Sequence, residues 1–227
     1  MSSENALLLA LESFKARYSG SPLPQKLDPP AGRREWISPD GMVSYNSYVY
    51  AFQVHTTIPQ SENSTGQFNS SETIIFAAAK AALFHDTETL ATILADPSMS
   101  PKDAKALGRI VSNFDPDVWA KESLWISDLT LLIKALFNPT MMQELLSTRG
   151  MLICEASPRD VIWGIGAPAK QVRVALVPRD WKGRNELGKS LARVRDYLLR
   201  VLEAEMVGDV AFLVDREKVV LFFSWFE

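Results

Sequence analysis

The sequence has little of what several classes of protein require. Its 227 residues include one cysteine, Cys154, which excludes an internal disulfide and a cysteine-based zinc site. His55 and His85 are the only histidines, too few to favour a multi-histidine metal site, and we expect both on the surface. No apolar run approaches the roughly 20 residues of a membrane-spanning helix. We therefore predict no metal site and no membrane partner.

Charge of one sign is also lacking. The net charge is -3, so no broad basic surface can hold nucleic acid by charge alone, although a local anion site fits this composition. Apolar residues make up 47% of the chain, which is typical of a folded globular protein and not of a disordered one. The apolar stretch at residues 6–11 is too short for a secretion signal. We expect a cytoplasmic protein, with a nuclear location as the alternative.

Apolar periodicity and three predicted helix caps, Asp86, Ser100 and Asp115, indicate an α+β protein in which helices dominate. A short amphipathic helix opens the chain, and a Pro-, Gly- and Ser-rich linker follows at residues 19–42. Further helices are expected over residues 72–84, 86–96, 100–112, 115–137, 139–147 and 184–206. The expected β elements are a strand or hairpin at 43–54, a buried strand at 151–157, a strand at 171–177 and a hairpin at 209–226. Residues 55–70 are expected to form a loop.

The predicted helix after residue 71 carries unusual charges. Its residues 73–84 read TIIFAAAKAALF, with Lys80 as the single charge, and Glu72 stands in the first turn, where the helix dipole favours an anion. Glu72 and Lys80 lie along one side of this helix. Charges on a buried helix are costly unless they pair or act on a ligand. The spacing leaves open a salt bridge, a capping role for Glu72, or a functional pair.

A first loop with functional potential is ASPRDVIWGIG at residues 156–166. It places Asp160 three residues before Trp163 and follows the tryptophan with two glycines, Gly164 and Gly166. Glycine lets a ligand approach the backbone, and a tryptophan offers a flat apolar face for a base or sugar. The alternative is a Pro/Gly turn with a packed tryptophan, and the glycines form only a fragment of a dinucleotide-binding fingerprint.

A second loop, at residues 181–185, precedes the predicted helix at 184–206. Lys182, Arg184, Asn185 and the amides of the helix N-terminus could hold a phosphate there. The alternative is a capped surface helix with a basic first turn. Arg109, at the end of another helical stripe, is either a further cation for an anionic ligand or a solvated arginine.

These motifs, taken in order, resemble the NADAR family, the YbiA-like N-glycosidases. The resemblance runs from about Phe68 to Leu198 and depends on Ser71-Glu72, Ala79-Lys80-Ala81, Phe84-x-Asp86, Leu107-Gly108-Arg109, Trp119, Glu155 to Gly166, Trp181 to Gly188 and Val194-Arg195. It implies a single YbiA-like domain with small β elements at residues 43–199. Residues 1–42 would be an N-terminal extension and linker, and residues 200–227 a divergent C-terminal extension.

The resemblance also implies an activity, hydrolysis of the C–N bond between a phosphorylated ribose and an amine or base. The ribose would belong to ribose 5-phosphate or ADP-ribose, as in an intermediate of riboflavin synthesis or in ADP-ribosylated guanine of a nucleic acid. A fixed carboxylate would stabilise the oxocarbenium-like ribose while another orients or deprotonates water. Glu72 and Asp160 would be the catalytic pair.

The remaining candidate residues would bind the substrate, and no metal or other cofactor is implied. Trp119 and Trp163 would flank the base or sugar, and Lys80, Arg109 and Lys182 would bind the phosphate. Gly164 and Asn185 would also bind the substrate. The stretch YVYAFQVHTTI at residues 48–58 replaces the motif that usually precedes the family's glutamate. This departure supports an alternative, a non-catalytic binder of ADP-ribose-like nucleotides.

Overall fold

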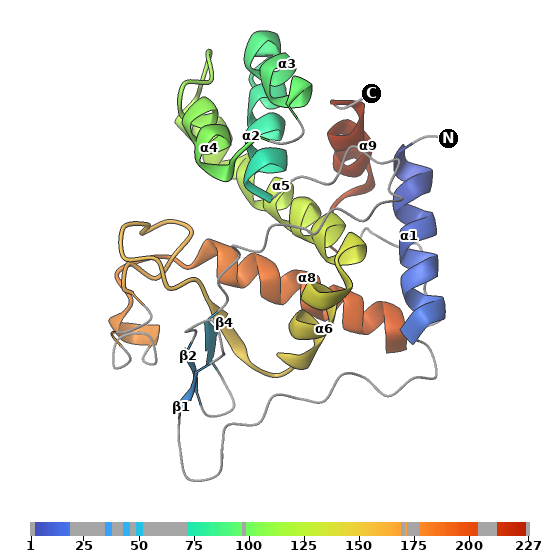
Figure 1. Ribbon diagram of the computed structural model, residues 1–227, viewed down its shortest axis with the longest axis vertical. Coiled ribbons are helices and arrows are strands. Elements are labelled where there is room, and N and C mark those ends of the chain that lie inside the picture. Colours follow the sequence, from blue (N-terminus) through green and yellow to red (C-terminus); the bar gives the residue numbers. More distant parts are fainter. Residues whose placement is uncertain are drawn as a thin grey trace. The chain divides into compact units, whose positions relative to one another are not determined.

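The computed structural model describes residues 3–18, 35–37, 43–45, 49–51, 72–96, 99–168, 171, 178–203 and 213–225 (Figure 1). These residues form an α+β structure in which helices dominate, as the sequence predicts. The chain divides into two compact units, one containing residues 1–14, 56–138 and 207–227 and the other residues 15–55 and 139–206. Among the described residues, no helix combines the length and apolarity needed to cross a membrane.

Helix α2 (Glu72–Leu83) is the centre of the first unit. It packs against α3 (Thr87–Ala95), α4 (Pro101–Arg109) and α5 (Pro116–Phe137) (Figure 1). The alanines that make α2 apolar also make it thin, so its neighbours approach closely. Ala77 and Ala78 contact Ile93 of α3 and Ala104 of α4 in one buried cluster.

The predicted caps of these helices are confirmed. Asp86 accepts a hydrogen bond from the Thr89 amide at the start of α3, and Ser100 accepts one from the Asp103 amide at the start of α4. Asp115 accepts from the first-turn amides of α5, and Pro101 and Pro116 occupy the first helical positions. The starts of these helices can therefore be predicted from the sequence, because each cap bonds to an amide only two or three residues away.

The C-terminal segment corrects one prediction, because the hairpin expected at residues 209–226 is wrong. Residues Arg216–Ser224 form helix α9, which Asp215 caps by accepting from the Glu217 amide. Val219, Phe222 and Phe223 are buried at helical spacing, and the Phe222 ring lies 6.3 Å from the Trp125 ring of α5. Asp215, near the middle of the expected hairpin, is instead a helix cap.

The second unit contains a four-stranded sheet. Its strands are β1 (Glu35–Ile37), β2 (Val43–Tyr45), β3 (Val49–Ala51) and β4 (Leu152–Cys154), in that order. The pairs β1–β2 and β2–β3 are antiparallel, whereas β3 and β4 are parallel, with Tyr50 opposite Ile153. The hairpin predicted at 43–54 and the strand at 151–157 are confirmed. The linker predicted at 19–42 is wrong at 35–37, because pairing with β2 makes this short segment a strand.

Helices α6 (Pro139–Ser147) and α8 (Glu186–Glu203) pack together in the second unit, and α8 also contacts β4. A short 3-10 helix, η1 (Pro178–Asp180), precedes α8. Leu191, Val194 and Leu198 of α8 are fully buried.

Helix α1 (Ser3–Tyr18) confirms the amphipathic N-terminal helix and buries Leu7, Leu11 and Phe14. The loop predicted at 55–70 and the strand predicted at 171–177 lie outside the described residues, apart from Gln171.

Candidate functional site

The predicted site residues fall into two groups, one in each unit. Glu72, Lys80, Arg109 and Trp119 belong to the first unit. Asp160, Trp163, Gly164, Lys182 and Asn185 belong to the second. Each group has its own local geometry.

In the first unit, Lys80 lies at the centre of a cluster that we call the lysine cluster: Lys80, Gly108, Phe114 and Trp119. The Lys80 Nζ atom donates a hydrogen bond of 2.6 Å to the Gly108 carbonyl at the end of α4. The same atom lies 3.9 Å from the centre of the Phe114 ring and 5.5 Å from that of Trp119. Both distances are within the range in which a ring face attracts a cation.

Other aromatic side chains support these rings. Phe76 of α2 and Phe84, which directly follows α2, lie four residues before and four residues after Lys80. The Phe76 ring lies 5.0 Å from the Trp119 ring, and the Phe84 ring lies 5.2 Å from the Phe114 ring. The sequence indicates this side of α2, but it gives no sign that Phe114 faces the lysine.

The ammonium of Lys80 is half-buried, and a described partner accepts from one of its three N–H donors. Burial lowers the pKa of Lys80 below its usual value because the charged form loses hydration. Among the side chains that the structure describes, no carboxylate forms an ion pair with it. An ammonium carries three N–H donors, and the Gly108 carbonyl takes one. This arrangement can accept an anionic ligand.

The other two predicted residues of the first unit, Arg109 and Glu72, have no described contact with Lys80. Arg109 follows Gly108 directly and has an exposed side chain. Glu72 is the first residue of α2, but its side chain lies outside the described residues. The Glu72–Lys80 salt bridge and the catalytic role of Glu72 therefore stay predictions.

In the second unit, Asp160 folds residues 155–166 into a loop that we call the tryptophan loop. Its Oδ1 atom accepts hydrogen bonds from the amides of Ile162, at 3.0 Å, and Trp163, at 2.7 Å. The Glu155 carbonyl accepts from the Ile165 amide at 2.9 Å and closes the loop. Asp160 thus shapes the turn that carries the half-buried Trp163.

The tryptophan loop binds the start of α8 through its main chain. Four loop carbonyls accept hydrogen bonds from four consecutive amides: Val161 from Arg184, Gly164 from Asn185, Ile162 from Glu186 and Trp163 from Leu187. These amides are the ones expected to hold a phosphate, so that expectation is corrected: the loop already uses them. Gly183 makes this contact possible, since a Cβ atom there would lie 2.1 Å from the Gly164 carbonyl oxygen.

Asn185 joins the same loop to β4. Its side chain is 1% exposed; Nδ2 donates to the Ile153 carbonyl at 2.8 Å and Oδ1 accepts from the Glu155 amide at 2.9 Å. Its φ of 56° lies in the left-handed region, which asparagine tolerates. Both side-chain groups are used within the fold, so Asn185 positions the loop, and its contact with a substrate stays a prediction. Lys182 is exposed.

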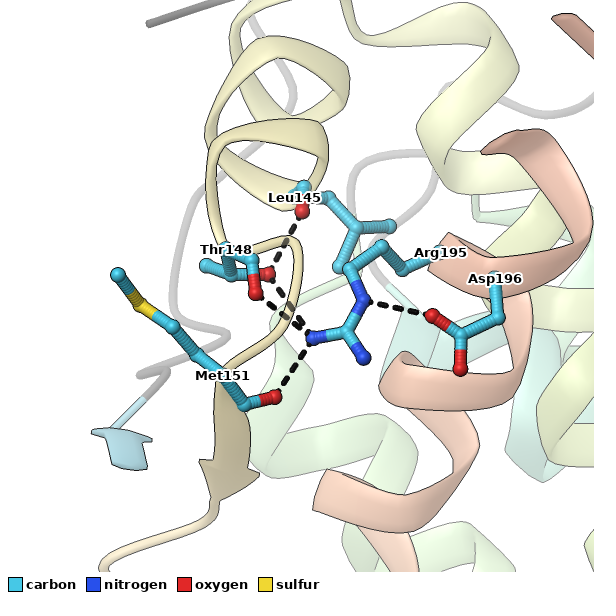
Figure 2. A network of polar contacts seen from close by, with 5 residues as sticks. All are labelled: Leu145, Thr148, Met151, Arg195 and Asp196. Carbon is cyan, nitrogen blue, oxygen red and sulfur yellow. Dashed lines mark hydrogen bonds and ion pairs between the residues drawn. The ribbon is translucent and has the colours of Figure 1, made fainter. Parts of the chain in front are cut away.

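Arg195 fixes the middle of α8 to the segment before β4 (Figure 2). Its Nη1 atom donates to the carbonyls of Thr148, at 2.9 Å, and Met151, at 2.8 Å, while Nε donates to Asp196. The side chain is 5% exposed. The arginine of the Val194-Arg195 motif therefore satisfies buried carbonyls that follow α6.

Nucleophilic thiol chemistry does not fit the described residues. Burial, with the nearby Glu155 charge, raises the pKa of Cys154 to about 12, so this thiol stays protonated at neutral pH. His85 is exposed, as predicted, and has a φ of 56° at the end of α2. His55 lies outside the described residues.

The sequence interpretation missed Phe114, and it gave the motif residues Gly108 and Asp86 no role in a site. Asp86 was expected only as a cap, but its second oxygen accepts from the Ser112 amide at 2.8 Å. The sequence offered one weak signal for these contacts, the placement of Phe76 and Phe84 on either side of Lys80.

Comparison with known proteins identifies several relatives. An N-glycosidase of Acanthamoeba polyphaga mimivirus is 44% identical over 92 residues, which cover 40% of this chain and 54% of the viral protein. The protein irg-1 of Caenorhabditis elegans is 34% identical over 125 residues, or 54% of this chain and 58% of that protein. A chloroplastic riboflavin biosynthesis protein of Zea mays is 32% identical over 111 residues, or 46% of this chain and 16% of the maize protein.

The matched regions thus span little more than half of the viral and nematode relatives and a smaller share of the maize protein. The model of the NADAR domain matches residues 34–199, well over half of the chain. That match includes α2 with Lys80, the tryptophan loop and most of α8. The chain therefore belongs to the NADAR domain family.

Proposed function

We propose that this protein is an N-glycosidase that hydrolyses the C–N bond between a phosphorylated ribose and an amine or base. The observation that carries the proposal is the half-buried Lys80 ammonium, which no described carboxylate neutralises and which lies beside Trp119. A cation next to an aromatic face suits a ligand that joins an anion to a flat ring. The names of the viral and maize relatives support N-glycosidase chemistry and a link to riboflavin intermediates.

The proposed reaction breaks the bond between ribose C1′ and the nitrogen of the leaving group. The bonding electrons go to that nitrogen, which takes up a proton, and C1′ becomes oxocarbenium-like. Glu72 is proposed as the carboxylate that stabilises this cation. Water then adds its oxygen to C1′ and gives up a proton, for which Asp160 is the proposed acceptor.

Binding roles are proposed for the other candidates. Lys80 and Arg109 would contact the phosphate, with Lys182 as a further cation. Trp119 and Trp163 would provide flat apolar faces for the base or sugar. The substrate half would be ribose 5-phosphate or ADP-ribose, and ADP-ribosylated guanine in a nucleic acid is one candidate substrate. The proposed location is cytoplasmic, with a nuclear location as the alternative.

The direct test incubates the protein with a ribosylaminopyrimidine intermediate of riboflavin synthesis and with ADP-ribosylated guanine, followed by mass analysis of the sugar released. We expect Glu72→Gln to lower turnover by about 10²–10⁴-fold. Glu88→Gln, a change at an exposed glutamate of α3, is the matched control and should leave turnover unchanged. Wild-type turnover in a folded Glu72→Gln variant would refute the role of Glu72.

Asp160 needs a separate pair of variants because its Oδ1 atom also holds the turn. Asp160→Asn keeps an oxygen that accepts both amides, whereas Asp160→Ala removes it. If Asp160 accepts a proton, both variants lose turnover. If it only shapes the loop, Asp160→Asn stays active and Asp160→Ala does not.

The alternative function is a non-catalytic binder of ADP-ribose-like nucleotides. The changed stretch before α2, at residues 48–58, favours it. Thermal protection by ADP-ribose, with no sugar released from either substrate, would establish this alternative.

A further inference from the structure

Asp86 connects two segments that are distant in sequence. It follows α2 and is 8% exposed, and its own amide donates to the Ala81 carbonyl of α2 at 2.9 Å. One carboxylate oxygen accepts from the Thr89 amide at 3.0 Å and caps α3. The other accepts at 2.8 Å from the amide of Ser112, which lies between α4 and α5.

The segment that Asp86 holds supplies half of the lysine cluster. It runs from Gly108, at the end of α4, whose carbonyl accepts from Lys80, to Phe114, whose ring lies over the Lys80 Nζ atom. The bond from Ser112 to Asp86 lies between these two contacts along the chain. A fixed Ser112 therefore restrains both the Gly108 carbonyl and the Phe114 ring that contact Lys80.

Two apolar contacts also restrain residues 110–115. Val111 alone among them is buried and packs against Ala81 and Phe84, and the exposed Phe114 ring contacts the Phe84 ring. Ile110 is 70% exposed and Phe114 is 43% exposed. Asn113 has a φ of 55°, so the backbone turns sharply next to Ser112.

We propose that Asp86 is a positioning residue, whose bond to the Ser112 amide holds the Gly108–Phe114 segment against Lys80 and thereby aims the ammonium. The consequence for binding rests on the proposed function, in which Lys80 contacts the anionic part of the substrate. Attraction of a cation to a ring falls quickly with distance, and so does a hydrogen bond with angle. A released segment would leave Lys80 flexible and more hydrated.

The variant Asp86→Asn separates the two oxygens. Its amide oxygen can still cap α3, because asparagine is as good a cap as aspartate, but its NH₂ group cannot accept from Ser112. Asp86→Ser is a second variant, since serine also caps helices but is too short to reach the second segment. Asp115→Asn is the matched control, because one oxygen of Asp115 accepts both amides and asparagine keeps that oxygen.

The first measurement needs no ligand. In protein labelled with ¹³C-lysine, the Phe114 and Trp119 rings should shift the ε-methylene resonance of Lys80 upfield, and Lys80→Met assigns the resonance by removing it. We expect Asp86→Asn and Asp86→Ser to lose most of this shift and Asp115→Asn to keep it. An unchanged resonance in folded Asp86→Asn and Asp86→Ser would overturn the proposal.

The second measurement is a double-mutant cycle with ADP-ribose as the probe. We expect Asp86→Asn to weaken binding by about tenfold, and to have no further effect in the Lys80→Met background if it acts through the lysine. An equal effect in both backgrounds would refute action through Lys80. If wild-type protein binds no ADP-ribose while the resonance still moves, the proposed function fails and the positioning role stands.

Discussion

The lysine cluster and the tryptophan loop hold their candidate residues by different means. Around Lys80, side chains contact side chains, and among the described residues its hydrogen bond goes to a carbonyl near a helix terminus. In the tryptophan loop, four main-chain carbonyls bind four amides of α8, and Gly183 leaves no room for a side chain. Contacts between side chains can relax around a substitution, whereas a close main-chain contact cannot. The first region should therefore tolerate changes that unfold the second.

The same substitution placed in both regions gives the largest expected difference. In Gly183→Ala, the new Cβ would meet the Gly164 oxygen at 2.1 Å, and we expect the free energy of unfolding to fall by about 4 kcal/mol or more. In Gly108→Ala, the nearest atom is the Ala77 Cβ at 3.3 Å. The better helix propensity of alanine should keep that change within about 1 kcal/mol. Denaturant unfolding of both variants measures the difference, and equal losses would contradict the comparison.

The two asparagines with left-handed backbones give the next largest effect. Asn185→Asp would place a carboxylate oxygen against the Ile153 carbonyl in a site that is 1% exposed. We expect a loss of about 3 kcal/mol, since the buried carboxylate keeps the Glu155 amide as a donor to one oxygen while its other oxygen faces a carbonyl. Asn113 also has a positive φ, but its side chain is exposed. Asn113→Asp should therefore change the free energy of unfolding by less than about 0.5 kcal/mol. Equal stabilities of the two variants would mean that Asn185 does not hold the loop.

In the lysine cluster, we expect function to change more than stability. Lys80→Met should weaken ADP-ribose binding by about 1.5–3 kcal/mol, because one charge-assisted hydrogen bond is lost. The melting temperature should stay close to that of the wild type, since methionine fills similar apolar space. Exposed Lys105 of α4 supplies the control, Lys105→Met, which should affect neither measurement. A stability loss of about 3 kcal/mol or more with unchanged binding would instead indicate that Lys80 neutralises Glu72.

The smallest effect concerns acid stability. Hydrogen bonds from the Ser112 and Thr89 amides lower the pKa of Asp86 to about 2 in the folded protein, whereas an aspartate in an unfolded chain titrates near pH ~3.9. The folded pKa is the lower one, so Asp86 stabilises the fold above about pH 4, and this contribution is lost as the pH falls toward 2. We expect Asp86→Asn to flatten the pH dependence of stability in this window. Identical acid limbs in thermal melts from pH 2 to 5 would contradict this.

Local signals in the sequence determined most helices. Asp86, Ser100 and Asp115 were identified as caps, and each accepts from an amide two or three residues ahead. Such bonds depend on neighbouring residues alone, so a linear pattern contains them. The family assignment had the same basis, because short motifs in a fixed order carried it.

Only the tertiary structure decided how the candidate residues are used. The main-chain partners of Lys80, Asn185 and Arg195 lie 28 to 47 residues away along the chain. No local pattern records such a pairing, so Phe114, the Ser112 bond and the use of the α8 amides went unpredicted. The same reason explains β1, which needs β2 to become a strand, and α9, whose apolar residues fit a strand or a helix until Trp125 of α5 packs against them. Sequence alone specified which residues carry charge and where helices begin, and packing between distant segments determined what each charge faces.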